Sequence, residues 1–269
     1  MKTTTALLFT AILLFALESS LGAQPRESLP DDFNEGGGAT ISGSVGAGVG
    51  YAPEFAGSGE SSAKFLPVVF LNYGPVFLNS DKGLGVRFDL LQGSLEISPA
   101  VNYRWARNEN LSPLLSGMGD VRGVVTLGGT IAYHYSDFVF SAQPFKGVNN
   151  SKGFNMNLKA AYLNRSSESF NYGISVSTSL ADKAYNQTYF GVTPEQSRRS
   201  GYREYKADSG FKDVGLKGTF DFFLSPEFSV DVFAGYTHLM GEAGKSPLVE
   251  RGSENQFSTG LIFLYHFGR

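Results

Sequence analysis

The clearest pattern in the chain is an alternation of large apolar and smaller residues from Gln256 to Phe267. Because successive side chains of a β-strand point to opposite faces, a period of two predicts a strand. Twelve residues at about 3.3 Å each, tilted by roughly 40°, span the apolar thickness of an outer membrane. One face is apolar and aromatic, whereas the other is small or weakly polar and carries Ser258, Gly260, Ile262, Leu264 and His266.

Similar alternation recurs along most of the chain and predicts further strands of the same kind. These segments are Thr40 to Tyr51, Lys64 to Tyr73, Val76 to Asn79, Leu84 to Leu90, Leu95 to Arg104, Val121 to Tyr135, Phe138 to Phe145, Phe154 to Tyr162, Phe170 to Leu180, Val214 to Phe222, and Phe228 to Tyr236. We therefore predict an all-β protein, a transmembrane antiparallel up-and-down β-barrel of about twelve strands, with ten as the alternative.

The lengths of the connections favour twelve strands over ten. Outer-membrane barrels have short periplasmic turns and longer extracellular loops. If the first strand runs outward, long loops near residues 105–120, 181–210 and 240–254 fall on one side, and the short turns fall on the other. Omitting the short strand at Val76 would scatter the long loops over both sides.

The N-terminal residues predict export. Lys2 precedes an apolar run from Ala6 to Leu17, and small residues follow, so we expect residues 1–23 to be a signal peptide cleaved near Gly22 or Ala23. The run is too short to cross a bilayer as a helix. We expect residues 24–38 to form a flexible periplasmic leader and residues 39–269 to form the barrel. The predicted location is the outer membrane of a Gram-negative bacterium.

The composition agrees with a sheet that has one face in lipid. Of 269 residues, 17% are charged and 14% are aromatic, with 33 Gly and no Cys. The net charge of -3 gives no indication of nucleic-acid binding. Because cysteine is absent and no histidines are paired at a ligand spacing, no metal or cofactor is predicted.

Catalytic chemistry has little support in the sequence. His134 and His266 fall on predicted inward faces, where a histidine is most often one polar wall residue among many. Serines are common on the same faces, so a Ser–His pair of the kind found in outer-membrane lipases or deacylases stays open as an alternative. No motif distinguishes one serine, and we predict a protein that is not an enzyme.

The inward faces are predicted to carry charges of both signs. They hold Arg87, Arg104, Arg122, Lys159, Lys217, Asp89, Glu96, Asp213, Asp221 and Asp231. In a narrow barrel, mutual pairing that fills the lumen is the favoured interpretation, and a selective pore is the second.

The loop at 181–210 contains the best candidate for an interaction surface. Thr193, Pro194 and Gln196 form the start of a capping box, which predicts a short helix ending near Gly201. Basic residues could contact lipopolysaccharide phosphates at the outer-membrane lipid surface, although a solvated loop face is the simpler interpretation. The candidate residues are Tyr189, Phe190, Gly191, Pro194, Gln196, Arg198, Arg199 and Tyr205.

Several blocks of sequence resemble the MltA-interacting protein (MipA/OmpV) family of outer-membrane proteins. They are Tyr51 to Ser58, Leu66-Pro67, Gly117 to Val121, Tyr189 to Ser197, Ser200-Gly201, Gly210 to Leu216, Leu239 to Ala243, and Ser246 to Glu250. The resemblance implies a scaffold that links a murein lytic transglycosylase to a penicillin-binding synthase, and it provides no catalytic residues. Adhesin, ligand-binding or stress-response roles, and a narrow channel, are the alternatives.

Overall fold

The structure, a computed structural model, describes residues 40–148 and 153–268. The expected signal peptide and leader lie outside these residues. The strands are β1 (Ile41–Pro53), β2 (Ser61–Tyr73), β3 (Val76–Asn79), β4 (Gly83–Val86), β5 (Phe88–Leu90), β6 (Leu95–Arg104), β7 (Val124–Tyr135), β8 (Phe138–Gly147), β9 (Phe154–Asn164), β10 (Phe170–Ala181), β11 (Gly210–Ser225), β12 (Phe228–Leu239) and β13 (Asn255–Phe267).

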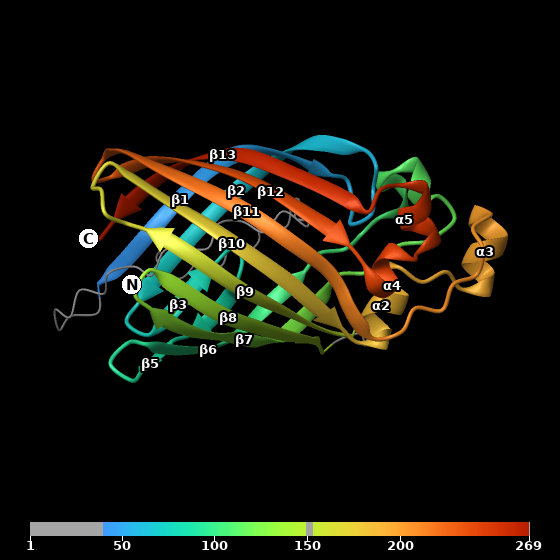
Figure 1. Cartoon of the computed structure of the whole chain (residues 1–269), viewed down its shortest axis with the longest axis horizontal. Helices are drawn as coiled ribbons and strands as arrows, with labels where there is room; N and C mark the ends of the chain where they lie inside the picture. Colours follow the sequence, from blue (N-terminus) through green and yellow to red (C-terminus); the bar gives the residue numbers. More distant parts are fainter. Residues whose placement is uncertain (1–39, 149–152, 269) are drawn as a thin grey trace, which may run out of the picture.

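The described residues form a closed antiparallel barrel (Figure 1). Each strand pairs with its neighbours in sequence, and β1 closes the ring against β13, with Val45 opposite Tyr265. The short segments β4 and β5 both pair with β6, so they are two halves of one strand interrupted at Arg87. The barrel therefore has twelve strands, as the sequence predicted, and the four-residue β3 is one of them.

The outward face of the barrel is the predicted apolar belt. Val49, Phe65 and Phe263 are 62%, 59% and 59% exposed in this isolated chain, as expected for side chains that face lipid. On β13 the alternate residues Ile262, Leu264 and His266 are buried inside. No helix in the described ranges is long and apolar enough to cross a membrane.

The lumen is less polar than the sequence predicted. Val68, Phe70, Phe233, Ile262 and Leu264 pack together inside the barrel as a buried cluster, the lumen cluster. Such large apolar side chains fill space that the inward charges alone were expected to fill. Among those charges, Glu96, Asp213, Asp221 and Asp231 are buried, but Asp89 is exposed, and Arg122 precedes β7 in an exposed loop position.

The seam between β1 and β13 depends on a close approach of backbones. A Cβ added to Gly48 would lie 2.1 Å from the carbonyl oxygen of Leu261 and 2.7 Å from the Cα of Ile262. At Gly50 the nearest atom would be the end of the flexible Leu66 side chain, at 2.9 Å. The backbone atoms of Leu261 and Ile262 cannot move aside as the end of the Leu66 side chain can. Gly48 and Gly50 should therefore differ in their tolerance of alanine.

We predict that Gly48→Ala destabilises the barrel by about 1–3 kcal/mol through overpacking, whereas Gly50→Ala has less effect. The measurement is the fraction of unheated protein that migrates as the compact form in detergent gels, followed against urea. Equal midpoints for the two variants would contradict the assigned seam geometry.

Candidate functional site

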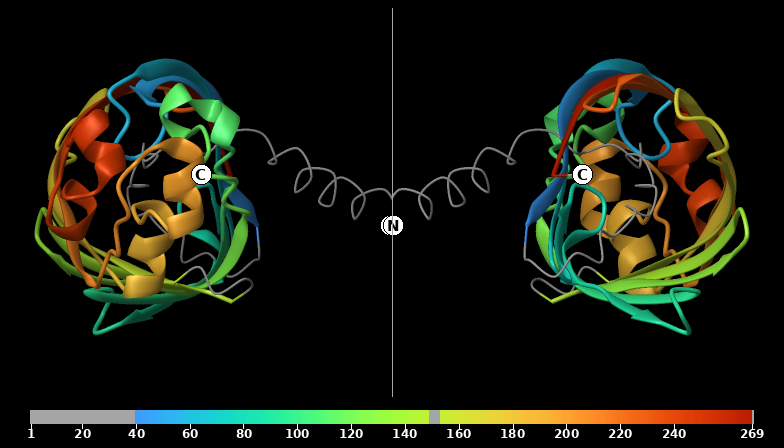
Figure 2. Two further views of the ribbon diagram at one scale, coloured as in Figure 1. Left: turned by 90° about the vertical axis from the view of Figure 1, so that its right-hand side faces the viewer. Right: turned by 90° about the vertical axis from the view of Figure 1, so that its left-hand side faces the viewer.

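Four connections at one end of the barrel pack into a structure that we call the outer cap, residues 54–60, 105–123, 182–209 and 240–254. They contain the short helices η1 (Glu109–Leu111), η2 (Pro113–Leu115), α2 (Lys183–Tyr189), α3 (Pro194–Ser200), α4 (Gly241–Gly244) and α5 (Pro247–Arg251). Among the described residues, the other end has only short turns, the start of β1 and the end of β13 (Figure 1). Viewed along the barrel, the cap helices lie across the opening (Figure 2).

The cap has apolar cores of its own. One core joins Phe55, Leu115, Met118, Tyr202 and Leu248, so it draws on all four connections. All five side chains are 5% exposed or less. Because apolar burial drives packing in a loop as it does in a domain, these connections hold a fixed arrangement.

A second core, which we call the Phe190 core, lies where α2 meets α4 and α5. Phe190 packs with Leu239, Ala243 and Val249, and its carbonyl accepts a hydrogen bond from the buried Ser246 hydroxyl at 2.6 Å. This contact joins the loop after β10 to the loop after β12.

Arg107 ties the loop after β6 to α2. Its guanidinium is buried and donates to the Tyr189 carbonyl at 2.9 Å. The Phe55 and Tyr189 rings lie 6.0 and 5.8 Å from it. A cation held by a carbonyl and two ring faces is consistent with a structural role.

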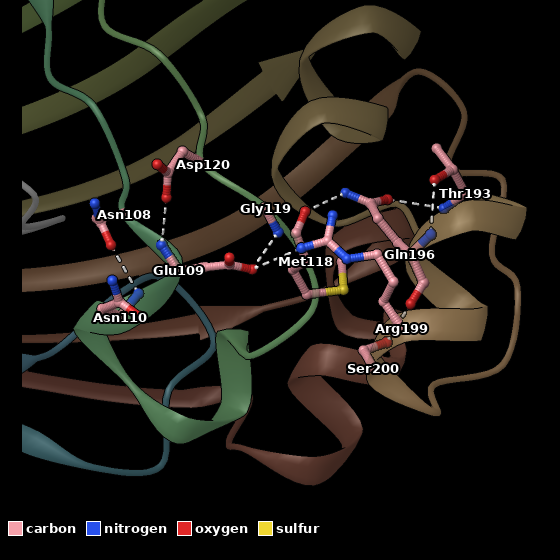
Figure 3. Close-up of polar contacts among 10 residues, drawn as sticks. All are labelled: Asn108, Glu109, Asn110, Met118, Gly119, Asp120, Thr193, Gln196, Arg199 and Ser200. Carbon is pink, nitrogen blue, oxygen red and sulfur yellow. Dashed lines mark hydrogen bonds and ion pairs between the residues drawn. The ribbon is translucent and has the colours of Figure 1, made fainter.

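Helix α3 forms as the sequence predicted. Thr193 accepts from the Gln196 backbone N–H and the Gln196 side chain accepts from the Thr193 backbone N–H, which completes the capping box, and Gly201 ends the helix with a φ of 75°. The Gln196 amide also donates to the Met118 carbonyl at 2.7 Å. Figure 3 shows these contacts, together with Arg199 reaching Glu109 at 3.4 Å.

The eight predicted interaction residues divide into two groups. Phe190 and Gly191 are buried within the cap, and Tyr189, Gln196 and Tyr205 are partly buried there. Tyr205 donates its hydroxyl to Glu242 at 2.9 Å, so its role in the structure is packing. The surface group consists of Pro194, Arg198 and Arg199. A contact with lipopolysaccharide therefore stays a prediction for this second group.

Beneath the cap, the lumen holds a cavity of about 440 Å³, which we call the outer chamber. Cap residues Phe55 and Tyr185 border it on one side, and Val68, Phe233 and Ile262 of the lumen cluster border it on the other. Its wall is rich in amides, hydroxyls and rings, including Asn102, Gln143, Asn155, Asn157, Ser177, Ser179, Thr237, Gln256, Trp105 and Phe145.

A β-bulge places an extra charge in the chamber wall. Ser179 pairs with Asp213 but Leu180 pairs with Phe211, so Lys212 has no partner in the ladder. The bulge turns Lys212 inward beside Asp213, and the two side chains form an ion pair. The alternation pattern does not predict this bulge, because strict alternation places neighbouring residues on opposite faces.

The sequence singled out His134 and His266, and the structure gives only His266 a serine network. Its ring nitrogens lie 2.6 Å from the Ser44 hydroxyl and 2.9 Å from that of Ser229, which donates to Asp231. All four residues are buried in the wall, away from the outer chamber. A histidine between two serines ties β1, β13 and β12 together. No group of potential metal ligands occurs among the described residues.

Three tyrosines of the cap are expected to respond to alkaline pH. Burial raises the pKa of Tyr189, Tyr202 and Tyr205 above the ordinary value of 10.0. The neutral phenol is thus favoured in the packed cap, so this contribution to the stability of the cap is complete below pH 10 and is lost as the pH rises above it.

We predict that protease cleaves the cap faster at pH 11 than at pH 9 while the barrel stays compact. Tyr202→Phe should reduce this difference, and cleavage independent of pH would contradict it.

The closed twelve-stranded antiparallel ring, the outward apolar belt and the long loops gathered at one end define the class of an outer-membrane β-barrel. Residues 45–267 match the family described as MltA-interacting protein MipA. The chain belongs to this family, and it is an outer-membrane protein of a Gram-negative bacterium, as the sequence predicted.

Two individual relatives match a shorter part of the chain than the family does. The "MltA-interacting protein" of Escherichia coli (strain K12) is 33% identical over 81 residues, which cover 30% of this chain and 32% of that protein. The protein of the same name in Shigella flexneri matches equally. The match thus spans about a third of these relatives.

Solved outer-membrane proteins also resemble the chain. An outer membrane channel of Pseudomonas putida F1 has 12% sequence identity and a TM-score of 0.42, covering 90% of this chain and 100% of that one. The NanC porin has 8% identity and a TM-score of 0.45, covering 84% of this chain and 100% of its own.

Proposed function

We propose that this protein is a scaffold of the cell envelope, one that holds a murein lytic transglycosylase, and with it a penicillin-binding synthase, at the outer membrane. The family and the fold support a non-enzymatic envelope barrel protein, and the relatives are named for interaction with MltA. The observation that carries the proposal is the packed cap and the apolar lumen cluster on either side of the outer chamber, because they suit a rigid holder better than an open pore.

A periplasmic partner would meet the inner end of the barrel. There the described residues offer only short turns, at 74–75, 91–94, 136–137, 165–169 and 226–227. Stable interfaces usually bury more than about 1,000 Å². Contact through such turns alone would be weak, so we assign residues 24–38 to the partner surface as part of the proposal.

The test is capture of the cross-linked mature protein from native envelopes, probed for the two murein enzymes. The matched variants are a deletion of residues 24–38 and the charge reversal of Arg198 and Arg199 to glutamate, which alters exposed cap residues. We expect the deletion to lose the enzymes and the charge reversal to retain them. Recovery of neither enzyme from any form, or loss only on charge reversal, would move the function to the outer face.

A narrow channel is the second candidate, and the outer chamber is the observation that favours it. Recordings in planar bilayers distinguish the two. A scaffold should give no stable conductance steps, whereas reproducible steps that change when Lys212 is substituted would establish conduction through the chamber.

A further inference from the structure

The outer chamber has features of a binding site that a scaffold does not require. Its volume of about 440 Å³ falls in the range of about 300–1,000 Å³ typical of small-molecule sites. Rings, amides and hydroxyls are present in the wall, contributed by strands β6 to β13 and by α2 of the cap.

Two side chains of β9 carry buried acceptors without a partner. The Oδ1 atoms of Asn155 and Asn157 are buried and accept no hydrogen bond. Asn157 uses its other amide atom to donate to the Ser179 hydroxyl at 3.2 Å. Because buried polar groups are nearly always satisfied, both oxygens call for hydrogen-bond donors, and both residues line the chamber.

The cations of the wall already have partners within it. Lys212 is paired with Asp213, Lys217 lies 4.9 Å from the Phe233 ring, and Arg104 lies 4.6 Å from the Tyr185 ring. The wall also holds the carboxylates of Asp81 and Asp213 against these three cations, so it has little excess charge to attract an ion. It instead offers acceptors, donors and apolar ring surface to a neutral molecule.

We propose that the outer chamber binds a small neutral saccharide, of one or two sugar units. Sugar hydroxyls supply the donors that Asn155 and Asn157 lack, and the apolar C–H faces of a sugar ring fit against the aromatic side chains of the wall. This role is independent of any protein partner, since it resides in the lumen.

The chain carries its own probe for this binding. Trp105 is the single tryptophan of the sequence, it lines the chamber, and its ring lies 4.8 Å from that of Tyr103. The full-length protein, folded in a detergent without a sugar headgroup, is titrated with glucose, N-acetylglucosamine and N,N′-diacetylchitobiose. We expect a saturable change in tryptophan emission with at least one of them.

Variants assign the signal to the chamber. The double variant Asn155→Ala with Asn157→Ala should weaken binding by about tenfold, as expected for two lost hydrogen bonds. Asn171→Ala is the matched control, because Asn171 is also a buried asparagine of the lumen but does not line the chamber. Each variant is first shown to migrate as the compact unheated form.

The proposal is overturned if none of the three sugars gives a saturable change. It is equally overturned if the double variant binds as well as the unmodified protein, or if Asn171→Ala weakens binding as much. In those cases the chamber holds water alone or the sugar binds elsewhere on the protein.

Discussion

Replacing Phe190 by alanine will loosen the outer cap while leaving the barrel closed. The side chain is 2% exposed and packs against Leu239, Ala243 and Val249. Removal of a buried phenylalanine costs about 3–5 kcal/mol, part of it from the cavity left behind. This loss falls on contacts between loops and leaves the hydrogen bonds of the strand ladder intact, so the cap opens locally before the ladder does.

Hydrogen exchange measures this opening. In Phe190→Ala the amides of residues 182–209 and 240–254 should exchange faster, while those of the strands keep their protection and unheated protein still migrates as the compact form. Phe257→Ala is the control, because Phe257 is 65% exposed on the outward face. Unchanged exchange in the cap, or loss of the compact form, would show that Phe190 does not hold the cap as an independent unit.

The barrel could be predicted because a strand in lipid imposes a strict rule on sequence. Every second residue must be apolar over the thickness of the membrane. The alternation from Phe257 to Phe267 in β13, and the same alternation in the other segments, therefore predicts both the strands and their outward faces. Even β3, with four residues, could be inferred, because omitting it would have placed long loops on both sides. Helix α3 could be predicted because the capping box at Thr193 is a local signal.

The cap could not be predicted because its contacts join residues far apart in the chain. Phe55, Leu115, Tyr202 and Leu248 come from four separate connections, and no periodicity marks a loop residue as buried. The interaction surface predicted from the sequence includes Phe190 and Tyr205, which pack inside the cap, and their part in binding stays a prediction. A contact of the exposed Arg198 and Arg199 with lipopolysaccharide stays a prediction.

The lumen was predicted in part. Alternation along Phe154 to Tyr162 and Phe170 to Leu180 is enough to place Asn155, Asn157 and Ser179 opposite the apolar faces of their strands, and these residues line the outer chamber. The same rule placed Ile262 and Leu264 inside, but a small or weakly polar face gave no reason to expect that they would join Phe233 in an apolar cluster. Which inward residues meet depends on strand stagger across the barrel, and the bulge at Lys212 changes that stagger locally.

The largest single effect on the barrel itself is expected at Glu96, where β4 and β5 meet β6. Its carboxylate lies 3.7 Å from the Lys82 ammonium and 3.8 Å from the Arg87 guanidinium, and it accepts from the Ser98 hydroxyl at 2.7 Å. All three charged side chains are 12% exposed or less. Removing the acid takes this carboxylate away from two cations in a buried site, so Glu96→Ala should destabilise the barrel by about 3–5 kcal/mol.

The midpoint of urea unfolding, followed by loss of the compact unheated form, measures the effect. Glu168→Ala, at an exposed inner turn, should stay within about 0.5 kcal/mol of the unmodified protein. Combining Glu96→Ala with Lys82→Met and Arg87→Met should recover much of the loss, because an entire buried ion cluster can often be exchanged for apolar residues at little cost. If the triple variant is no more stable than Glu96→Ala, the loss does not come from uncompensated charge, and the glutamate acts instead through its contact with Ser98 on β6.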